Sequence, residues 1–315
     1  MKPIKVGISS CLLGESVRYD GSHQLNRFLK DILGRYVEWV PVCPEVECGL
    51  PTPREAMRLV GTPENYRLLT QKTKIDHTER MMTWSHSKLD LLETEELCGF
   101  VFKKRSPSSA LRDAKLYSEK GIPYSKGPGM FGGEFIRRFP LIPVEDDGRL
   151  NDDGIRENFI ERLFAVARWK AFLASDGSLQ GLIHFHMTHK LLLMAHSPSH
   201  LRKLGKLVGN AIKQDTAMLL NDYFAVMMEA MGLKATVKKN VNVLHHAMGY
   251  FKKKISADAK NELLEVIEDY HRELVPLIVP VTLINHYTRL YNEAYLQDQV
   301  YLNPHPVELK LRNHA

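Results

Sequence analysis

The sequence predicts an α/β domain with a mostly parallel sheet, followed by an all-α domain. Strand-like runs alternate with helical segments in the first half, which is typical of a parallel sheet. From residue 155 onward, the chain shows almost only the 3.6-residue periodicity of helices. Residues 144–154, between these two parts, are acidic and rich in turn-forming residues. We therefore place the domains at residues 1–150 and 155–315.

The first domain contains short apolar runs separated by helix-like segments. Strands are expected at residues 4–8, 37–42 and 99–102, with another beginning within 140–143. Helices are expected at residues 24–33 and 78–95. The glycine-rich segment 127–133 matches neither a Walker phosphate loop nor a dinucleotide fingerprint, so we expect a flexible loop there. Arg54 and Arg58 are expected either to meet an anionic substrate group or to face solvent.

The second domain is expected to be helical throughout. Helices are predicted at residues 156–173, 181–194, 198–209, 215–231, 237–254, 257–275 and 280–291. Ser197, followed by Pro198, and Ser256 are good N-cap residues for two of these helices.

The composition is that of an ordinary globular protein. Of the 315 residues, 44% are hydrophobic and 25% are charged, which excludes collagen, coiled-coil arrays and bulk disorder. The longest apolar run, residues 274–284, is broken by two prolines and is shorter than the roughly 18 residues of a membrane span. The N-terminus enters a strand-like run without a signal-peptide core, so we expect a cytoplasmic protein with reduced thiols.

Four cysteines lie in the first third of the chain, and three of them are candidates for one site. Cys11 and Cys43 each follow a predicted strand, and parallel strands end at the same edge of a sheet, where ligands bind. Cys48 follows Cys43 by five residues, a spacing that two ligands of one cluster can span. This spacing leaves zinc, a redox-active thiol pair and an iron–sulfur cluster open. Cys98 is expected to be a small buried hydrophobe.

Four short motifs occur in register over about residues 1–145. They are Gly7-Ile8-Ser9-Ser10-Cys11-Leu12-Leu13-Gly14, Val17-Arg18-Tyr19-Asp20-Gly21, Val42-Cys43-Pro44-Glu45 and Ser106-Pro107-Ser108. Together they resemble the thiouracil desulfurase family. The resemblance implies a [4Fe–4S] cluster held by three cysteines, with one iron left open to take sulfur from a thiolated nucleobase. It also implies that Glu45 is a general acid/base and that Ser106 positions substrate or relays a proton.

Ser109 departs from the pattern of that family. The third cysteine of the family usually stands at this place, and a serine hydroxyl is a poor iron ligand compared with a thiolate. We hypothesise that Cys48 replaces the missing thiolate, so that Cys11, Cys43 and Cys48 hold the cluster. The competing hypothesis is a degenerate domain that has lost its cluster.

The helical domain carries three motifs rich in histidine. They are Thr188-His189-Lys190-Leu191-Leu192-Leu193-Met194-Ala195-His196-Ser197-Pro198, Asn242-Val243-Leu244-His245-His246 and Tyr301-Leu302-Asn303-Pro304-His305-Pro306. In these motifs the domain looks like the YbgA family. The first motif and the nearby His184 and His186 include no carboxylate, so we do not predict a metal site there.

The net charge of +6 is unevenly distributed along the chain. Residues 181–254 contain 11 Lys and Arg residues against 3 acids, whereas residues 255–315 contain 5 against 9. The basic stretch either contacts phosphates of RNA or a nucleotide or forms a solvated face of the protein. The candidate residues are Lys238, Lys239, Lys252, Lys253 and Lys254.

The sequence therefore predicts iron–sulfur-dependent desulfuration of a thiolated nucleobase or a related thiocarbonyl compound. The alternative is a non-catalytic protein that binds nucleic acid or a protein partner through its basic helical domain, with a degenerate cluster site in its first half.

Overall fold

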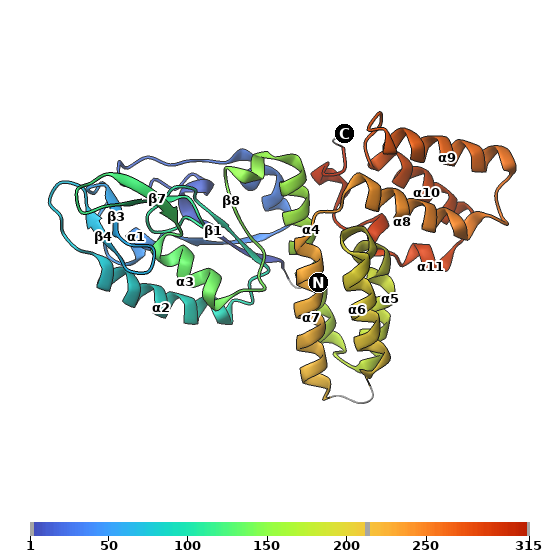
Figure 1. The fold of residues 1–315 in the computed structure, drawn as a ribbon, viewed down its shortest axis with the longest axis horizontal. Coiled ribbons are helices and arrows are strands. Elements are labelled where there is room, and N and C mark those ends of the chain that lie inside the picture. Colours follow the sequence, from blue (N-terminus) through green and yellow to red (C-terminus); the bar gives the residue numbers. More distant parts are fainter. Residues whose placement is uncertain (1–2, 212–214, 314–315) are drawn as a thin grey trace. The chain divides into compact units, whose positions relative to one another are not determined.

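A computed structural model describes residues 3–211 and 215–313 of the chain. The chain divides into two compact units, Met1–Asp152 and Asp153–Ala315. The first unit contains strands and helices, and the described residues of the second contain helices and turns but no strand (Figure 1). The predicted fold class, an α/β half followed by a helical half, is confirmed.

The main sheet of the first unit, sheet A, is parallel throughout. Its order is β2-β1-β5-β8, with β1 at Lys5–Ser9, β2 at Glu38–Val42, β5 at Gly99–Phe102 and β8 at Val144–Asp146. The first three strands confirm the prediction, and the fourth begins slightly later than expected. Because the pairs β1/β2 and β1/β5 are both parallel, the carboxyl ends of these strands share one edge.

A second sheet in this unit, sheet B, is not predicted by the sequence. Its order is β4-β3-β6-β7, with β3 at Met57–Gly61, β4 at Tyr66–Thr70, β6 at Ala114–Tyr117 and β7 at Pro123–Gly127. The pairs β3/β4 and β6/β7 are antiparallel, and β3/β6 is parallel. The sequence of β7 is Pro-Tyr-Ser-Lys-Gly, which contains residues that are depleted in strands. Pairing with β6, rather than intrinsic propensity, makes this segment a strand.

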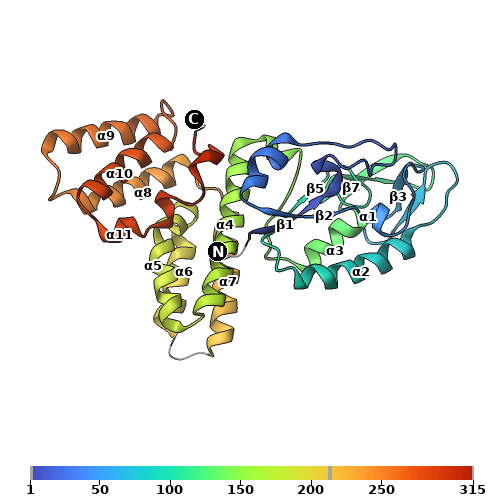
Figure 2. The ribbon, with the colours of Figure 1, turned by 180° about the vertical axis from the view of Figure 1, so that it is seen from behind.

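Two longer helices, α2 at Thr78–Thr94 and α3 at Met130–Arg138, pack against each other and against both sheets (Figures 1 and 2). One core cluster joins them to sheet A through Phe100, Phe102 and Phe135, and a second joins them to sheet B. The helix expected at residues 78–95 is confirmed as α2.

The remaining helical segments of this unit are short. The helix expected at residues 24–33 does not form as an α-helix. Instead, a π-helical turn at Phe28–Ile32 is followed directly by a 3₁₀ turn at Leu33–Arg35. The side chain of Asn26 accepts a hydrogen bond from Leu29 N at 3.1 Å and so starts the helical turn later than periodicity suggests. The other short segments are a 3₁₀ turn at Ser10–Leu13, α1 at Pro44–Glu47 and a 3₁₀ turn at Arg149–Asn151.

The glycine-rich segment does not form the expected flexible loop. Gly129 is the N-cap residue of α3, and Gly132 lies in the first turn of this helix. A Cβ on Gly129 would lie 2.6 Å from the carbonyl oxygen of Ser108, and one on Gly132 would lie 2.4 Å from that of Ala110. The amide of Gly132 donates to the same Ser108 oxygen at 3.1 Å. Because these two residues have no Cβ, the backbone of α3 can pack directly against the backbone of the loop of residues 106–109 and so support it.

Gly132→Ala is expected to destabilise the first unit by about 1–3 kcal/mol, because the new methyl group would overlap backbone atoms of the supported loop. Gly133→Ala is the matched control on the same helix, since the nearest atoms to its Cβ belong to side chains, the Pro128 ring at 3.3 Å and the Tyr66 hydroxyl at 3.8 Å. Both substitutions gain the same helix propensity. Urea unfolding of the two variants tests this prediction, and equal stabilities would contradict it.

The second unit consists of eight α-helices within its described residues. They are α4 at Asp153–Ser175, α5 at Leu179–His196, α6 at Pro198–Gly209, α7 at Thr216–Gly232, α8 at Val237–Met248, α9 at Ala257–His271, α10 at Ile278–Leu290 and α11 at Ala294–Gln297. The seven predicted helices are confirmed, one with the predicted bounds, α6, and six with shifted ends. The helix expected to reach residue 254 ends at Met248, where a 3₁₀ turn follows, and α11 is not predicted.

Side-chain caps fix the beginnings of several of these helices. Ser197 and Ser256 accept hydrogen bonds from the backbone N–H groups of His200 and Ala259, which confirms both predicted N-caps. Helix α5 lies at the centre of the unit and packs against α6, α7 and α8. Its buried side chains include His189 and His196.

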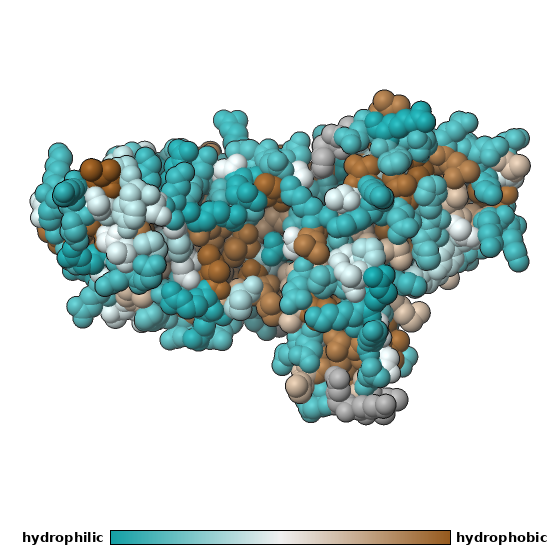
Figure 3. Space-filling model, in the orientation of Figure 1, coloured by the Kyte–Doolittle hydropathy of each residue, from teal (hydrophilic) through white to brown (hydrophobic). Residues whose placement is uncertain are grey.

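In the described part of the chain, no helix is both long and apolar enough to cross a membrane. Figure 3 shows that hydrophilic residues cover much of one face of the molecule, with hydrophobic patches between them. Exposed apolar residues such as Leu274 and Val307 are normal on protein surfaces when they are scattered.

Candidate active site

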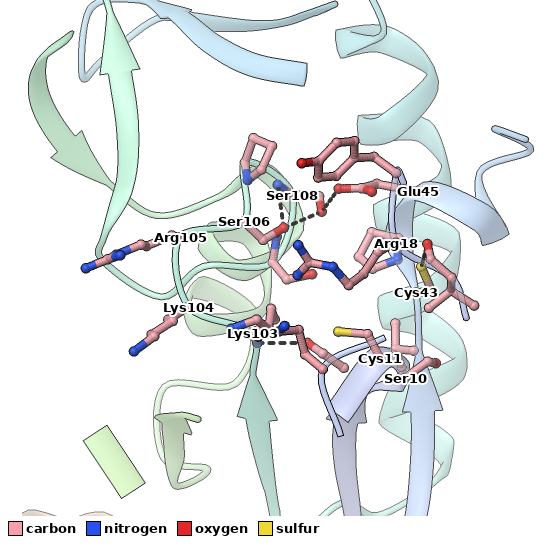
Figure 4. A pocket seen from close by; sticks show the side chains of 18 of the residues that line it. Ser10, Cys11, Arg18, Cys43, Glu45, Lys103, Lys104, Arg105, Ser106 and Ser108 are labelled. Atoms are coloured by element: carbon pink, nitrogen blue, oxygen red, sulfur yellow. Dashed lines mark hydrogen bonds between the residues drawn. The ribbon is translucent and has the colours of Figure 1, made fainter. Parts of the chain in front are cut away.

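A cavity of about 390 Å³ lies at the carboxyl edge of sheet A, in the first unit. The segments that follow β1, β2 and β5 form most of it, as expected where parallel strands end (Figure 4). The cavity is lined by residues 9–11, 17–19, 24, 42–45, 54 and 103–109. The structure therefore brings together Cys11, Cys43, Glu45 and Ser106, four of the five predicted site residues.

Cys11 and Cys43 stand at the ends of neighbouring strands. Cys11 lies in the 3₁₀ turn after β1, and Cys43 is the N-cap residue of α1, directly after β2. Burial raises the pKa of Cys11 to about 12, although the charge of Lys103 acts in the opposite direction. Burial also raises the pKa of Cys43. Both side chains are therefore protonated thiols at neutral pH, and a metal that bound them would displace their protons.

Cys48 lies at the other end of α1 and does not line the cavity. Its Sγ donates a hydrogen bond to the carbonyl oxygen of Glu45 at 3.3 Å. It borders a separate surface depression between α1 and α2, beside Arg80 and Trp84. The structure therefore does not bring Cys48 to Cys11 and Cys43.

The side chains as placed do not match a cluster held by three thiolates. Ser109 lines the cavity at the place of the missing cysteine, but a hydroxyl is a weak ligand for iron. Among the residues that the structure describes, no group of three or more Cys, His, Asp or Glu side chains could hold a metal ion. The cavity offers two thiols of the expected ligand set and lacks the third.

Two consecutive hydrogen bonds connect Ser106 and Ser108 to Glu45, and in each the donor is the hydroxyl farther from the carboxylate (Figure 4). Ser108 donates its hydroxyl proton to Glu45 Oε1 at 2.9 Å, so its oxygen accepts from Ser106 Oγ, also 2.9 Å away. The Ser106 oxygen accepts the backbone N–H groups of Ser108 and Ser109 at 3.3 and 3.1 Å. A proton can therefore pass from Ser106 to Glu45 through one intervening hydroxyl.

Arg54 holds Glu45 in this position. Its Nη2 forms an ion pair with Glu45 Oε2, and the arginine side chain is only 4% exposed. The same nitrogen donates to the carbonyl oxygen of Val17 at 3.0 Å, which ties Arg54 to the loop after β1. The sequence alone indicates no role at the site for Ser108, and it leaves open whether Arg54 meets a substrate group or solvent. Arg58 does not line the cavity; it is half-buried, and its guanidinium carbon lies 5.2 Å from the ring centre of Tyr117.

Positive charge gathers around the cavity. Arg18, Lys103, Lys104 and Arg105 line it, in addition to Arg54. Lys103 Nζ pairs with Asp147 at 2.8 Å, and Lys103 and Arg18 both favour the ionised form of Cys11. The potential of such a cavity stabilises anions, including thiolates and hydrosulfide.

The five lysines predicted to contact RNA or a nucleotide lie at the beginning of α8 and after its end. Lys238, Lys252 and Lys253 are exposed. Lys239 Nζ donates to the carbonyl oxygens of His196 and Lys234 at 2.7 and 3.0 Å, and Lys254 pairs with Glu293 at 2.6 Å. Two of the five lysines therefore make contacts within the protein. The contact of the five lysines with RNA or a nucleotide stays a prediction.

Comparison with known proteins divides the chain into two parts as well. Residues 6–147 match the family model for 2-thiouracil desulfurase, and residues 190–306 match that for DUF1722, a protein of unknown function. The chain is 32% identical over 154 residues to YbgA of Escherichia coli, covering 48% of this chain and 90% of YbgA. It is also 32% identical over 108 residues to YbbK of Bacillus subtilis, covering 32% of this chain and 70% of YbbK.

A solved structure, that of the [4Fe–4S]-dependent thiouracil desulfidase TudS, is also similar to part of the chain. It is 28% identical, with a TM-score of 0.39, and the match covers 47% of this chain and 93% of TudS. The match to YbgA extends over nearly the whole of that protein. The chain therefore belongs to the YbgA family, with a first part that matches 2-thiouracil desulfurase and a second part that matches DUF1722.

Proposed function

We propose that the first unit removes sulfur from a thiolated nucleobase or a related thiocarbonyl compound. The observation that carries this proposal is the hydrogen-bonded chain from Ser106 through Ser108 to Glu45, in a cavity that also contains Cys11 and Cys43. The match of residues 6–147 to 2-thiouracil desulfurase supports this class of substrate.

The proposed reaction is a hydrolysis. Water adds to the thiocarbonyl carbon and the C–S bond breaks, so that C=S and H₂O become C=O and H₂S without oxidation or reduction. Glu45 takes a proton of the attacking water through Ser108 and Ser106, and the same chain returns it to the departing sulfur. Arg54 orients the carboxylate, and the charges of Arg18 and Lys103 stabilise the negative sulfur.

The cofactor that we propose for this domain is a [4Fe–4S] cluster, with Cys11 and Cys43 as two of its ligands. Cys48 is the proposed third ligand, in place of the cysteine that Ser109 replaces. To reach the cavity, Cys48 must give up its hydrogen bond to Glu45 O, and α1 must unwind. The geometry as described therefore supports two of the three proposed ligands.

Iron content tests the roles of the three cysteines. After anaerobic reconstitution, Cys11→Ser and Cys43→Ser are expected to lose bound iron, because both thiols line the cavity. Cys48→Ser is expected to lose it as well, because Cys48 is the proposed third ligand. The measurement is iron and acid-labile sulfide per chain, together with the visible charge-transfer band. An unchanged band in Cys48→Ser would refute Cys48 as a ligand, and iron-free wild type would favour a degenerate site.

Turnover of 2-thiouracil tests the function itself. Anaerobically prepared wild-type protein is expected to convert 2-thiouracil or 4-thiouracil to uracil with release of one sulfide per molecule. Folded, iron-loaded protein that releases no sulfide from either compound would refute the proposal.

We also propose that the protein works in the cytoplasm, where its four free cysteines stay reduced.

A further inference from the structure

The helical unit buries a cluster of charged side chains that the proposed reaction does not use. Glu161 on α4, His196 at the end of α5 and Arg312 after α11 are 3%, 0% and 5% exposed. Arg312 Nη2 donates to Glu161 Oε1 at 2.9 Å, and His196 Nε2 lies 3.1 Å from Glu161 Oε2. Three segments far apart in the sequence thus meet at one carboxylate. Buried charges with perturbed ionisation are concentrated at functional sites.

Glu161 is a carboxylate in this cluster. Burial alone would raise the pKa of Glu161, but the hydrogen bond from His196 and the charge of Arg312 hold it well below its usual range. Nδ1 of His196 lies 2.6 Å from the carbonyl oxygen of Leu233, which can only accept, so Nδ1 carries a proton. Arg168 is a further buried cation, and its charge interacts with that of Glu161.

A cavity of about 140 Å³ borders these three residues. One buried donor at this cavity lacks an acceptor, because Arg312 Nε makes no hydrogen bond within the described part of the chain. Glu157 Oε1 lies 3.8 Å from Arg312 Nε, which is too far for a hydrogen bond. Leaving a buried donor unsatisfied costs about 1–3 kcal/mol, and a ligand oxygen would remove that penalty.

Glu157 determines the charge of the cavity. Burial, followed by the charge of Glu161, raises the pKa of Glu157 to about 8, while Arg312 acts in the opposite direction. At pH 7 most Glu157 is therefore neutral, and its carboxyl group can donate a hydrogen bond. The other titratable groups around the cavity or coupled to Glu157 are Asp153, Lys234, Tyr270, Glu273 and Tyr301. Of these, Asp153, Lys234 and Glu273 are exposed, so solvent screens their charges.

We propose that this cavity binds a small monocarboxylate with a short apolar chain. Its carboxylate accepts a hydrogen bond from Arg312 Nε and another from the neutral carboxyl group of Glu157. Its negative charge lies beside the buried guanidinium of Arg312. The lining includes Val237 and Val275, against which the apolar chain packs.

Titration of the full-length chain with sodium butyrate, followed by ligand-observed NMR, tests this site. Binding is expected at pH 7 and is expected to be about tenfold weaker at pH 9, because Glu157 must be protonated. Glu157→Gln, which stays neutral, is expected to bind butyrate equally well at both pH values. If Glu157 had only a structural role, Glu157→Gln would bind butyrate with the same pH dependence as the wild-type protein.

Two further variants locate the binding site. Arg312→Gln removes the unsatisfied donor and is expected to lose binding, with circular dichroism showing whether the helices persist. Ala235→Phe fills the cavity without changing any charge, and it is expected to lose binding even if Arg312→Gln unfolds. Butylammonium chloride and sodium chloride at equal ionic strength are the controls. Butyrate binding that does not saturate, tighter binding of butylammonium, or full binding by Ala235→Phe would each overturn the proposal.

Discussion

Glu45→Gln is expected to lower kcat for thiouracil desulfuration by about 10²- to 10⁴-fold, the range typical of a lost general acid or base. An amide cannot take up the proton that Ser108 delivers, and it also loses the ion pair with Arg54. The effect is expected in kcat rather than KM, because the carboxylate acts on a proton in transfer. Anaerobic assays of sulfide release over a range of thiouracil concentrations separate the two constants.

Two variants make this result specific. Ser108→Ala keeps Glu45 but interrupts the chain to Ser106, and kcat is expected to fall here too. Glu119→Gln removes the same charge from a side chain of the first unit that is 71% exposed, and it is expected to keep full activity. If Glu45→Gln retained the activity of Glu119→Gln, Glu45 would not be the general acid/base.

The largest loss of stability is expected from Glu161→Gln. This change leaves Arg312 as a buried cation without its counter-charge, and breaking such a buried pair costs about 3–5 kcal/mol. Glu268→Gln is the matched control, since Glu268 also pairs with an arginine on a helix of this unit but lies in solvent. It is expected to leave the free energy of unfolding nearly unchanged. Urea unfolding followed by circular dichroism compares the two.

Glu161 also determines how the stability of this unit depends on pH. Its pKa in the folded protein lies well below its ordinary value of 4.5. The stabilisation that it contributes is therefore present above pH 4.5 and is lost as the pH falls below that value. Glu161→Gln has no such group, so its stability is expected to fall less between neutral and acidic pH. Parallel pH profiles of the two proteins would contradict the assignment.

The meeting of Cys11 and Cys43 could be predicted because it follows from strand order. Each cysteine comes directly after a strand, and β1 and β2 are parallel neighbours, so the two thiols reach one edge. The place of Cys48 depends instead on a single helical turn, with Cys43 at its N-cap and Cys48 at its C-cap. A spacing of five residues does not reveal whether the chain between two cysteines is coiled or extended.

Other parts of the site and fold depend on contacts that no local pattern indicates. Arg54 reaches Glu45 across a loop, and Arg312 reaches Glu161 from 151 residues away. Glu157 and Glu161 are one helical turn apart, a spacing that ordinarily indicates a solvated acidic face. Sheet B could not be predicted from local sequence either, because its short segments become strands through pairing with one another.

The support that α3 gives to the loop of Ser106 and Ser108 has a consequence for translation. Cys11, Cys43 and Glu45 leave the ribosome before this loop, and the glycines of α3 follow the loop. A nascent chain that ends before Gly129 therefore contains both thiols of the cavity and Glu45, but it lacks the α3 backbone against which the loop packs. The loop that contacts Glu45 can thus be held in place only after α3 has also been made.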